Sequence, residues 1–194
     1  MAKLLSPIAG RKAEDVAASL LSHFGSLGRA MTAPDRQLIK ACESEPEIGE
    51  MLIAARTLME TALLENVVRT VLEPENPSFL RYLVLKMQGK QHEELHAIFV
   101  DEDQGFIAEE LMSSGSPDRV ESRIRPIVSR AIALNASGFY LAHNHPSGEP
   151  QPSASDVRAT RAIIQVCKAL DLKLLDHFVV AGDKVSSMKK LGLL

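Results

Sequence analysis

The chain has 194 residues, which is enough for one large domain or two small ones. Its 45% hydrophobic and 24% charged residues are typical of soluble globular proteins, and no apolar run approaches the roughly 18 residues of a membrane span. The net charge is −3. Residues 1–75 carry eight basic and eleven acidic side chains, and residues 76–194 carry fourteen of each. Neither part is therefore the basic domain that is usual in nucleic-acid binders.

The first part of the chain is predicted to be helical. Apolar and charged residues alternate at helical spacing over residues 13–24 and 51–72, and the acidic segment 43–50 is expected to be a turn. The segment EPENPS at 73–78 contains two prolines and an asparagine, which marks the clearest break in the chain. We therefore expect a small helical domain to end at residue 75.

Helices and strands interleave in the second domain, residues 76–194. Helices are expected over 78–89, 120–136 and 153–172, and strands over 95–102, 106–114, 139–143 and 173–182. The turn DEDQG lies between the first two strands, and this pattern predicts a hairpin. This order predicts an α/β or α+β domain with a central sheet.

The cysteines and the N-terminus indicate the compartment. Cys42 and Cys167 lie far apart without partners at metal-binding spacing, which favours buried thiols in a reducing environment. The first residues lack the basic start, apolar run and small-residue cleavage site of a secretion signal. We therefore expect a cytoplasmic protein that does not associate with membranes.

The pattern HEELH at residues 92–96 is also found in zinc hydrolases, where its two histidines share one face of a helix. Gly89 ends the preceding helix, however, and the residues that follow favour a strand. In an extended segment the Cα atoms of His92 and His96 would lie about 13 Å apart. A single zinc ion with bonds of about 2 Å cannot span that distance. We expect a polar lead-in to an edge strand, and no metal site.

The segment HNHPSGEPQPSASD, residues 143–156, is the better candidate for a metal site. His143 and His145 share one face at the end of an expected strand, and their Cα atoms lie about 6.6 Å apart if extended. Asp156 follows a proline-rich loop at the start of a helix, and this donor set leaves a fourth position open for water. Two simpler explanations remain: Ser153 and Asp156 also form a capping-box pattern, and the histidines could be hydrogen-bonded in a turn.

This segment resembles the H-x-H-x(7)-S-x(2)-D motif of the JAMM (MPN+/JAB) metalloproteases, and LAHNHPSGEPQPSASD is similar to the bacterial RadC family. The similarity extends to ELHAIFVDEDQGFIAEELMSSGS, RPIVSRAIALNASGFYLAHNHPSG and LLDHFVVAG, so that it covers roughly residues 77–194. The resemblance implies a RadC-type JAMM/MPN domain with a mixed central β-sheet flanked by helices, in a cytidine-deaminase-like layout.

The resemblance also implies site residues. His143, His145 and Asp156 would bind Zn²⁺, and the Ser153 hydroxyl would hydrogen-bond the oxyanion that develops on the substrate. An upstream glutamate would be the general base.

Alignment with the family pattern favours Glu110 as that base, with Glu109 as the alternative. Adjacent residues in a strand face opposite sides, so only one can reach the metal site. His177, beside Asp176, is left with two roles, a structural hydrogen bond or support of a metal ligand.

The first domain resembles the family less. RadC proteins carry helix-hairpin-helix elements there, which bind DNA backbones, but the corresponding ESEPEIGEML retains one Ile-Gly pair among four glutamates that would repel phosphates. We therefore expect a degenerate helix-hairpin-helix with a scaffold or protein-interaction role.

Three functions follow as hypotheses. The first is a zinc-dependent hydrolase that cleaves a peptide or isopeptide bond in a protein or peptide substrate, with ubiquitin-like proteins among the candidates. The second is a RadC-like DNA-repair or DNA-processing protein whose zinc domain acts on or near DNA. The third is a non-catalytic, zinc-stabilised interaction module.

Overall fold

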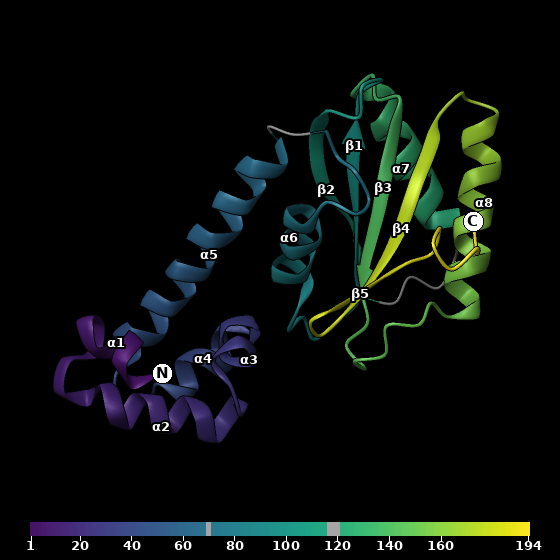
Figure 1. Cartoon of the computed structure of the whole chain (residues 1–194). Coiled ribbons are helices and arrows are strands. Elements are labelled where there is room, and N and C mark those ends of the chain that lie inside the picture. The colour runs from purple at the N-terminus through teal and green to yellow at the C-terminus, as the bar shows by residue number, and fades with distance from the viewer. Residues whose placement is uncertain (69–70, 116–120) are drawn as a thin grey trace. The chain divides into compact units, whose positions relative to one another are not determined.

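The contacts of the chain divide it into two compact units, Met1–Ala62 and Leu63–Leu194 (Figure 1). The computed structural model describes residues 1–68, 71–115 and 121–194. Residues 69–70 of the helix expected over 51–72, and residue 120 of the helix expected over 120–136, lie outside the described part. The division lies within a helix, and the expected boundary after residue 75 stays a prediction. Among the described helices, none is both long and apolar enough to cross a lipid bilayer.

The first unit is helical. Its elements are α1 (Ala2–Ala9), η1 (Gly10–Lys12), α2 (Ala13–Phe24), α3 (Leu27–Thr32), α4 (Asp35–Ala41) and the first part of α5 (Pro46–Val68). Buried aliphatic side chains, among them Leu20 and Leu38, form its core. The expected turn over 43–50 is therefore wrong in its second half. Pro46 is well suited to the first position of a helix, where its missing N–H is not needed, and Ile48 is buried in the core.

The second unit contains a five-stranded sheet in the order β2-β1-β3-β4-β5. The strands are β1 (Glu94–Val100), β2 (Phe106–Ser114), β3 (Gly138–Asn144), β4 (Lys173–Ala181) and β5 (Lys184–Ser187). β3 and β4 are parallel and the other neighbours are antiparallel, so the sheet is mixed. Two expectations need correction: β5 was not predicted, and β1 is an inner strand between β2 and β3 instead of an edge strand.

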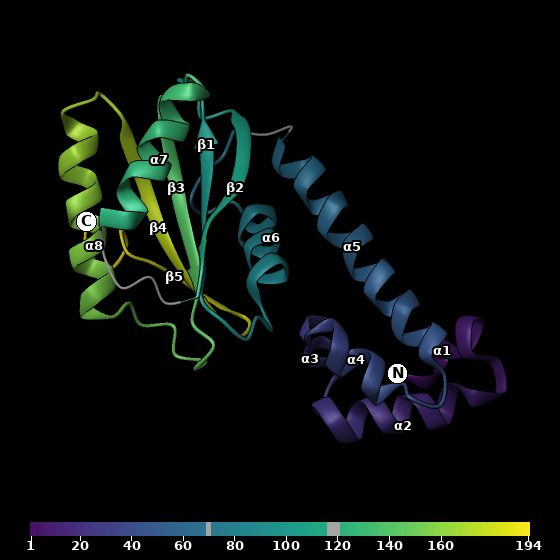
Figure 2. The same ribbon diagram turned by 180° about the vertical axis from the view of Figure 1, so that it is seen from behind.

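Helices cover both faces of the sheet, as Figures 1 and 2 show from opposite sides. α6 (Pro77–Met87) packs on one face, where Phe79 contacts the rings of Tyr140 and Phe178. α7 (Glu121–Ala133) and α8 (Ala154–Lys168) lie on the other, with Ile127 and Ile163 in a second core. Since side chains alternate along a strand, the sheet buries one set of residues against each layer. The expected α+β architecture, a mixed sheet flanked by helices, is confirmed.

The connection from β3 through α8 to β4 creates the place for a site. Parallel neighbours require such a crossover, and it brings the end of β3, the loop after it and the first turn of α8 together. In that loop, Gly148 adopts φ +84°, a conformation that glycine accepts without strain, and its N–H bonds the carbonyl of His145. The chain thereby turns back toward the sheet before α8 begins.

Candidate metal site

The side chains of His143, His145 and Asp156 converge at the end of β3. His143 is the next-to-last residue of β3. The N–H of His145, just after the strand, donates to the carbonyl of Val180 at 2.8 Å and so extends the pairing with β4. Asp156 enters from the first turn of α8. One ligand atom from each of the three residues lies within 4.8 Å of the others. The structure therefore brings together the three residues that the motif suggests, two of them buried.

The spacing of these atoms fits a small tetrahedral cation. His143 Nε2 lies 3.0 Å from His145 Nε2, and Asp156 Oδ2 lies 3.6 Å from the former and 3.4 Å from the latter. Two atoms bound to a tetrahedral zinc ion at about 2.05 Å lie about 3.4 Å apart, so the observed triangle matches one face of such a tetrahedron. An ion held by this face would keep one further position for a water or a substrate oxygen.

The protonation of two of these groups also suits a cation. Nδ1 of His145 lies 2.8 Å from the carbonyl oxygen of Glu149, which can only accept, so Nδ1 carries the hydrogen and Nε2 offers a lone pair. Burial opposes ionisation of Asp156, but the nearby ring of His143, 3.6 Å away, and the hydrogen bonds from Ser153 hold the pKa of its carboxyl well below the usual range. Metal binding requires such deprotonated ligands.

Ser153 is the N-cap of α8. Its hydroxyl accepts from the N–H of Asp156, and the N–H of Ser153 donates to Asp156 Oδ2 at 2.7 Å, which completes a capping box. The simpler structural explanation of this pair is therefore present in the molecule. It does not exclude the chemical role, because Ser153 is exposed and its hydroxyl also contacts Oδ2 and the Ser155 hydroxyl beside the metal ligands. The cap fixes Asp156 in place.

Glu109 and Glu110 occupy opposite faces of β2. Glu110 pairs with Ala97, whose neighbour in β3 is Leu141, and it shares the α7–α8 face with His143. Glu110 lies two strands across the sheet from His143 and two residues along it, because Glu110 pairs with Ala97 and His143 pairs with Leu95. At standard strand spacing this offset corresponds to about 12 Å between the Cα atoms of Glu110 and His143. The Nε of Arg130 on α7 donates to Glu110 Oε1 at 2.6 Å.

Glu109 faces α6 instead, in a buried hydrogen-bond network. Its carboxylate accepts from Tyr82 and from Nδ1 of His96 at 2.6 Å, and Lys86 Nζ lies 3.9 Å away. Burial raises the pKa of Glu109, but the hydrogen bonds from His96 and Tyr82 outweigh it, and the net shift is downward. Glu109 is therefore satisfied on the face of the sheet that the metal ligands do not share.

The HEELH segment is not helical, as predicted from its surroundings. Residues 92–93 lie outside regular structure and β1 starts at Glu94. His92 is exposed, while the ring of His96 is buried between Glu109 and Glu94. Asn144, next to His143, fastens the segment to β3 by accepting from the N–H of Glu94 and donating to the carbonyl of His92. The segment lies beside the end of β3 without contributing a ligand.

Two further residues lie behind the metal ligands: His177, for which the sequence left a structural role and support of a metal ligand open, and Thr160, which was not assigned. Nδ1 of His143 lies 2.8 Å from Nε2 of His177 on β4, and Nδ1 of His177 lies 2.7 Å from the hydroxyl of Thr160 on α8. Thr160 falls within the mostly apolar stripe of its helix, so the apolar pattern alone does not distinguish it. Its spacing of four residues from Asp156, on one face of the helix, was the available signal.

The hairpin between α4 and α5 in the first unit shows exposed carboxylates. Glu43, Glu47 and Glu50 are exposed, and Glu45 pairs with Lys12. Acidic side chains at this point repel a phosphate backbone, so the hairpin gives no support to DNA contact.

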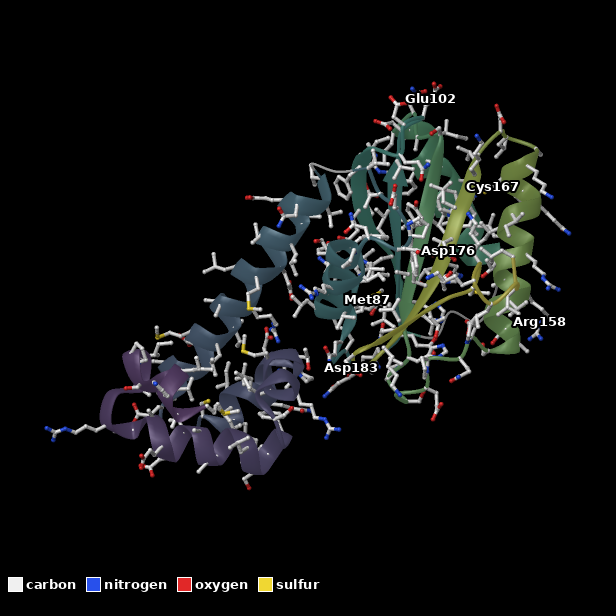
Figure 3. All side chains as sticks on the ribbon, in the orientation of Figure 1. Met87, Glu102, Arg158, Cys167, Asp176 and Asp183 are labelled. Carbon is white, nitrogen blue, oxygen red and sulfur yellow. The ribbon has the colours of Figure 1, made fainter. Side chains whose placement is uncertain are left out.

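The buried thiols agree with the sequence-based expectation. Cys42 and Cys167 are free and buried, and burial raises the pKa of the Cys167 thiol to about 11. Figure 3 labels Cys167 on α8, and its side chain belongs to the core between that helix and the sheet.

Comparisons with known proteins agree with this architecture. A family model described as a RadC-like JAB domain matches residues 74–193. A UPF0758 protein of Herminiimonas arsenicoxydans is 33% identical over 187 residues, which cover 96% of this chain and 84% of the relative. UPF0758 proteins of Thiobacillus denitrificans and Nitrosomonas eutropha are 34% and 32% identical, and the matches cover 97% and 98% of this chain and 84% and 85% of those relatives.

Proposed function

The chain belongs to the RadC-like JAB domain family, and from its His-His-Asp cluster we propose that it is a zinc-dependent hydrolase that cleaves a peptide or isopeptide bond. The observation that carries the proposal is the triangle of ligand atoms, with edges of 3.0, 3.4 and 3.6 Å, at the open end of the sheet. His143, His145 and Asp156 would hold the ion. Zinc, when bound, lowers the pKa of a coordinated water toward neutrality and polarises a carbonyl group.

Glu110 is proposed as the group that moves the proton. Its side chain lies on the same face as the ligands and is 31% exposed, so that the carboxylate could accept a proton from the attacking water and return it to the leaving nitrogen. Arg130 holds this carboxylate in position by its bond to Oε1. Glu109 could not exchange roles with it, because its carboxylate is bound to Tyr82 and His96 on the opposite face.

Ser153 is proposed to stabilise the oxyanion. Its exposed hydroxyl lies at Asp156, beside the expected reacting carbonyl, and rotation about one side-chain bond turns its hydrogen from Asp156 Oδ2 toward a substrate oxygen. A donor of this kind stabilises developing negative charge by about 3 kcal/mol. The capping box keeps the backbone of Ser153 in place while its hydroxyl changes partner.

The first experiment tests metal binding. Zinc content is measured by elemental analysis for the wild type, His143→Ala and His92→Ala. We expect about one zinc per chain in the wild type and in His92→Ala, whose exposed ring lies outside the cluster, and a loss of zinc in His143→Ala. Equal zinc content in His143→Ala and the wild type would refute the site.

The second experiment tests hydrolysis. The zinc-loaded protein is incubated with a peptide library and with ubiquitin-like fusion proteins, and new amino termini are identified by mass spectrometry. Glu110→Gln should keep zinc but reduce cleavage by 10²- to 10⁴-fold, the usual contribution of a general base. Glu109→Gln is the matched control and should cleave at close to the wild-type rate. Cleavage by Glu110→Gln at the wild-type rate would overturn the assignment.

A further inference from the structure

A chain of hydrogen bonds runs from one proposed metal ligand back to another. It starts at Nδ1 of His143, which lies 2.8 Å from Nε2 of His177. It continues from Nδ1 of His177 to the Thr160 hydroxyl at 2.7 Å, and from that hydroxyl to the main-chain carbonyl of Asp156 at 2.6 Å. The four residues come from β3, β4 and α8, and Asp156 closes the loop because its carboxylate faces His143 at 3.6 Å.

The carbonyl at the end fixes the direction of every bond in this chain. A carbonyl oxygen can only accept, so a separation of 2.6 Å places the single hydrogen of the Thr160 hydroxyl between the two oxygens. That hydroxyl must therefore accept from His177, which puts the hydrogen of the neutral ring on Nδ1. Nε2 of His177 then has a lone pair and accepts from Nδ1–H of His143. With both rings neutral, Nε2 of His143 and Nε2 of His145, 3.0 Å apart, each direct a lone pair at the cluster, and no hydrogen lies between these two atoms.

Burial keeps water from replacing any of these partners. Thr160 is completely buried, and His143 and His177 are each 5% exposed. The rings of the two histidines meet edge to face with their centroids 4.8 Å apart, so a rotated ring would lose its packing. In a site without bulk water, the tautomer of each ring is set by the protein groups around it.

Asp176 fixes the strand that carries His177. Its carboxylate, 1% exposed, accepts from the N–H groups of His177 and Lys189 at 2.7 and 3.0 Å, and from the Ser187 hydroxyl. Figure 3 labels Asp176 on β4, and Arg158 on the exposed side of α8. The helix therefore directs Asp156 and Thr160 inward while Arg158 stays in solvent.

We propose that Thr160 and His177 are positioning residues that hold His143 in its Nδ1–H tautomer and thereby present Nε2 to a metal ion. This inference rests on the proposed metal site. The buried threonine and histidine would fix the tautomer of a metal ligand before the ion binds. Partners of this kind behind a metal ligand typically change affinity by 10- to 100-fold when removed.

Thr160→Val is the most specific perturbation. Valine has nearly the shape of threonine but offers no oxygen, so Nδ1–H of His177 would lose its acceptor. His177 would then favour the tautomer with its hydrogen on Nε2, which donates to Nδ1 of His143 and forces the hydrogen of His143 onto Nε2. A ring protonated at Nε2 cannot bind the ion through that atom. Thr160→Ser keeps the hydroxyl and should keep the arrangement.

The first measurement needs no variant and no metal. Long-range proton–nitrogen correlation spectra of isotope-labelled histidine, recorded on metal-free wild type at mildly alkaline pH, report which nitrogen of each ring is protonated. We expect hydrogens on Nδ1 of His143 and Nδ1 of His177. A hydrogen on Nε2 of His143 with Nδ1 unprotonated would overturn the inference, whatever the protein does with zinc.

The second measurement compares variants. Zinc affinity is determined by competition with a chromophoric chelator for the wild type, Thr160→Val, Thr160→Ser and Thr32→Val. Thr32 is the matched control, since it is also buried and its hydroxyl also bonds a carbonyl four residues earlier, but in the first unit. Thr160→Val should weaken zinc binding at least 10-fold and shift the His143 tautomer, while the other two variants should match the wild type.

The outcomes separate this inference from the proposed function. Wild-type affinity or an unchanged His143 tautomer in Thr160→Val refutes the positioning role. Undiminished zinc binding by His143→Ala refutes the metal site, and leaves the tautomer result to stand by itself. Thermal unfolding of the metal-free variants shows whether Thr160→Val is folded. If it is not folded, the tautomer of His143 in the wild-type spectrum still tests the inference.

Discussion

Replacing Glu109 by glutamine should destabilise the protein, whereas the same change at the adjacent Glu110 should leave its stability nearly unaltered. The Glu109 side chain is 9% exposed and its carboxylate accepts from Tyr82 and His96, whereas Glu110 is 31% exposed and pairs with Arg130, which is 44% exposed. The two substitutions have identical chemistry and differ only in the face of β2 on which they fall.

The magnitudes follow from this difference. A buried hydrogen bond to a charged group contributes about 1.5–3 kcal/mol, and glutamine keeps one acceptor of the two, so Glu109→Gln should cost about 2 kcal/mol. An exposed ion pair contributes about 0–1 kcal/mol, so Glu110→Gln should cost about 0.5 kcal/mol or less. At roughly 4 °C per kcal/mol for a unit of this size, the melting temperatures should fall by about 8 °C and 2 °C.

Thermal unfolding of both metal-free variants, followed by circular dichroism at neutral pH, provides the measurement. The pH adds a second check. Because the pKa of Glu109 is lowered by folding, its contribution to stability is present above the pKa of the unfolded state, about 4.3, and is lost as the pH falls through the folded value. The difference between wild type and Glu109→Gln should therefore shrink below about pH 4. Equal melting temperatures of the two variants at neutral pH would refute the assignment of faces.

Three further outcomes are expected. Chelation of zinc should lower the melting temperature of the wild type. If the free zinc concentration before chelation is 100 times the dissociation constant, the loss of stability is about 2.7 kcal/mol, and His92→Ala should respond identically. Neither Cys42 nor Cys167 should react with iodoacetamide at neutral pH without denaturant, because burial raises the pKa of both thiols, and rapid labelling measured by mass spectrometry would contradict their burial. Gly138→Ala should cost about 2 kcal/mol in chemical denaturation, since a Cβ would lie 2.8 Å from the carbonyl oxygen of Lys173; an unchanged midpoint would show that the strands separate easily there.

The candidate cluster could be found from the sequence because its spacing is local. His143 and His145 are two residues apart in a strand, and Ser153 and Asp156 mark the start of a helix, so secondary structure alone places their side chains on shared faces. The exclusion of HEELH was local in the same way, since it depended only on whether residues 92–96 form a helix.

Local patterns fail where the outcome depends on a neighbouring strand. Adjacent glutamates in β2 must face opposite sides, but which of them shares the side of His143 depends on the register with β1 and β3. β1 was expected at an edge and lies inside the sheet, and the four-residue β5 carried too short a pattern to be recognised. These features depend on pairing between segments that are distant in the chain.

The sequence by itself determined the helical first part and the α+β character of the second, because each depends on spacing within single elements. It also identified the two histidines and the aspartate of the cluster, because they lie within one short segment, at the end of a strand and at the start of the next helix. Only the tertiary structure decided that Glu110 and not Glu109 shares their face, and that His96 joins Glu109. It also placed Thr160 against His177, 17 residues apart, and His177 against His143, 34 residues apart. Those contacts exist because β4 returns beside β3 after the crossover through α8, and no periodicity within one element records such a return.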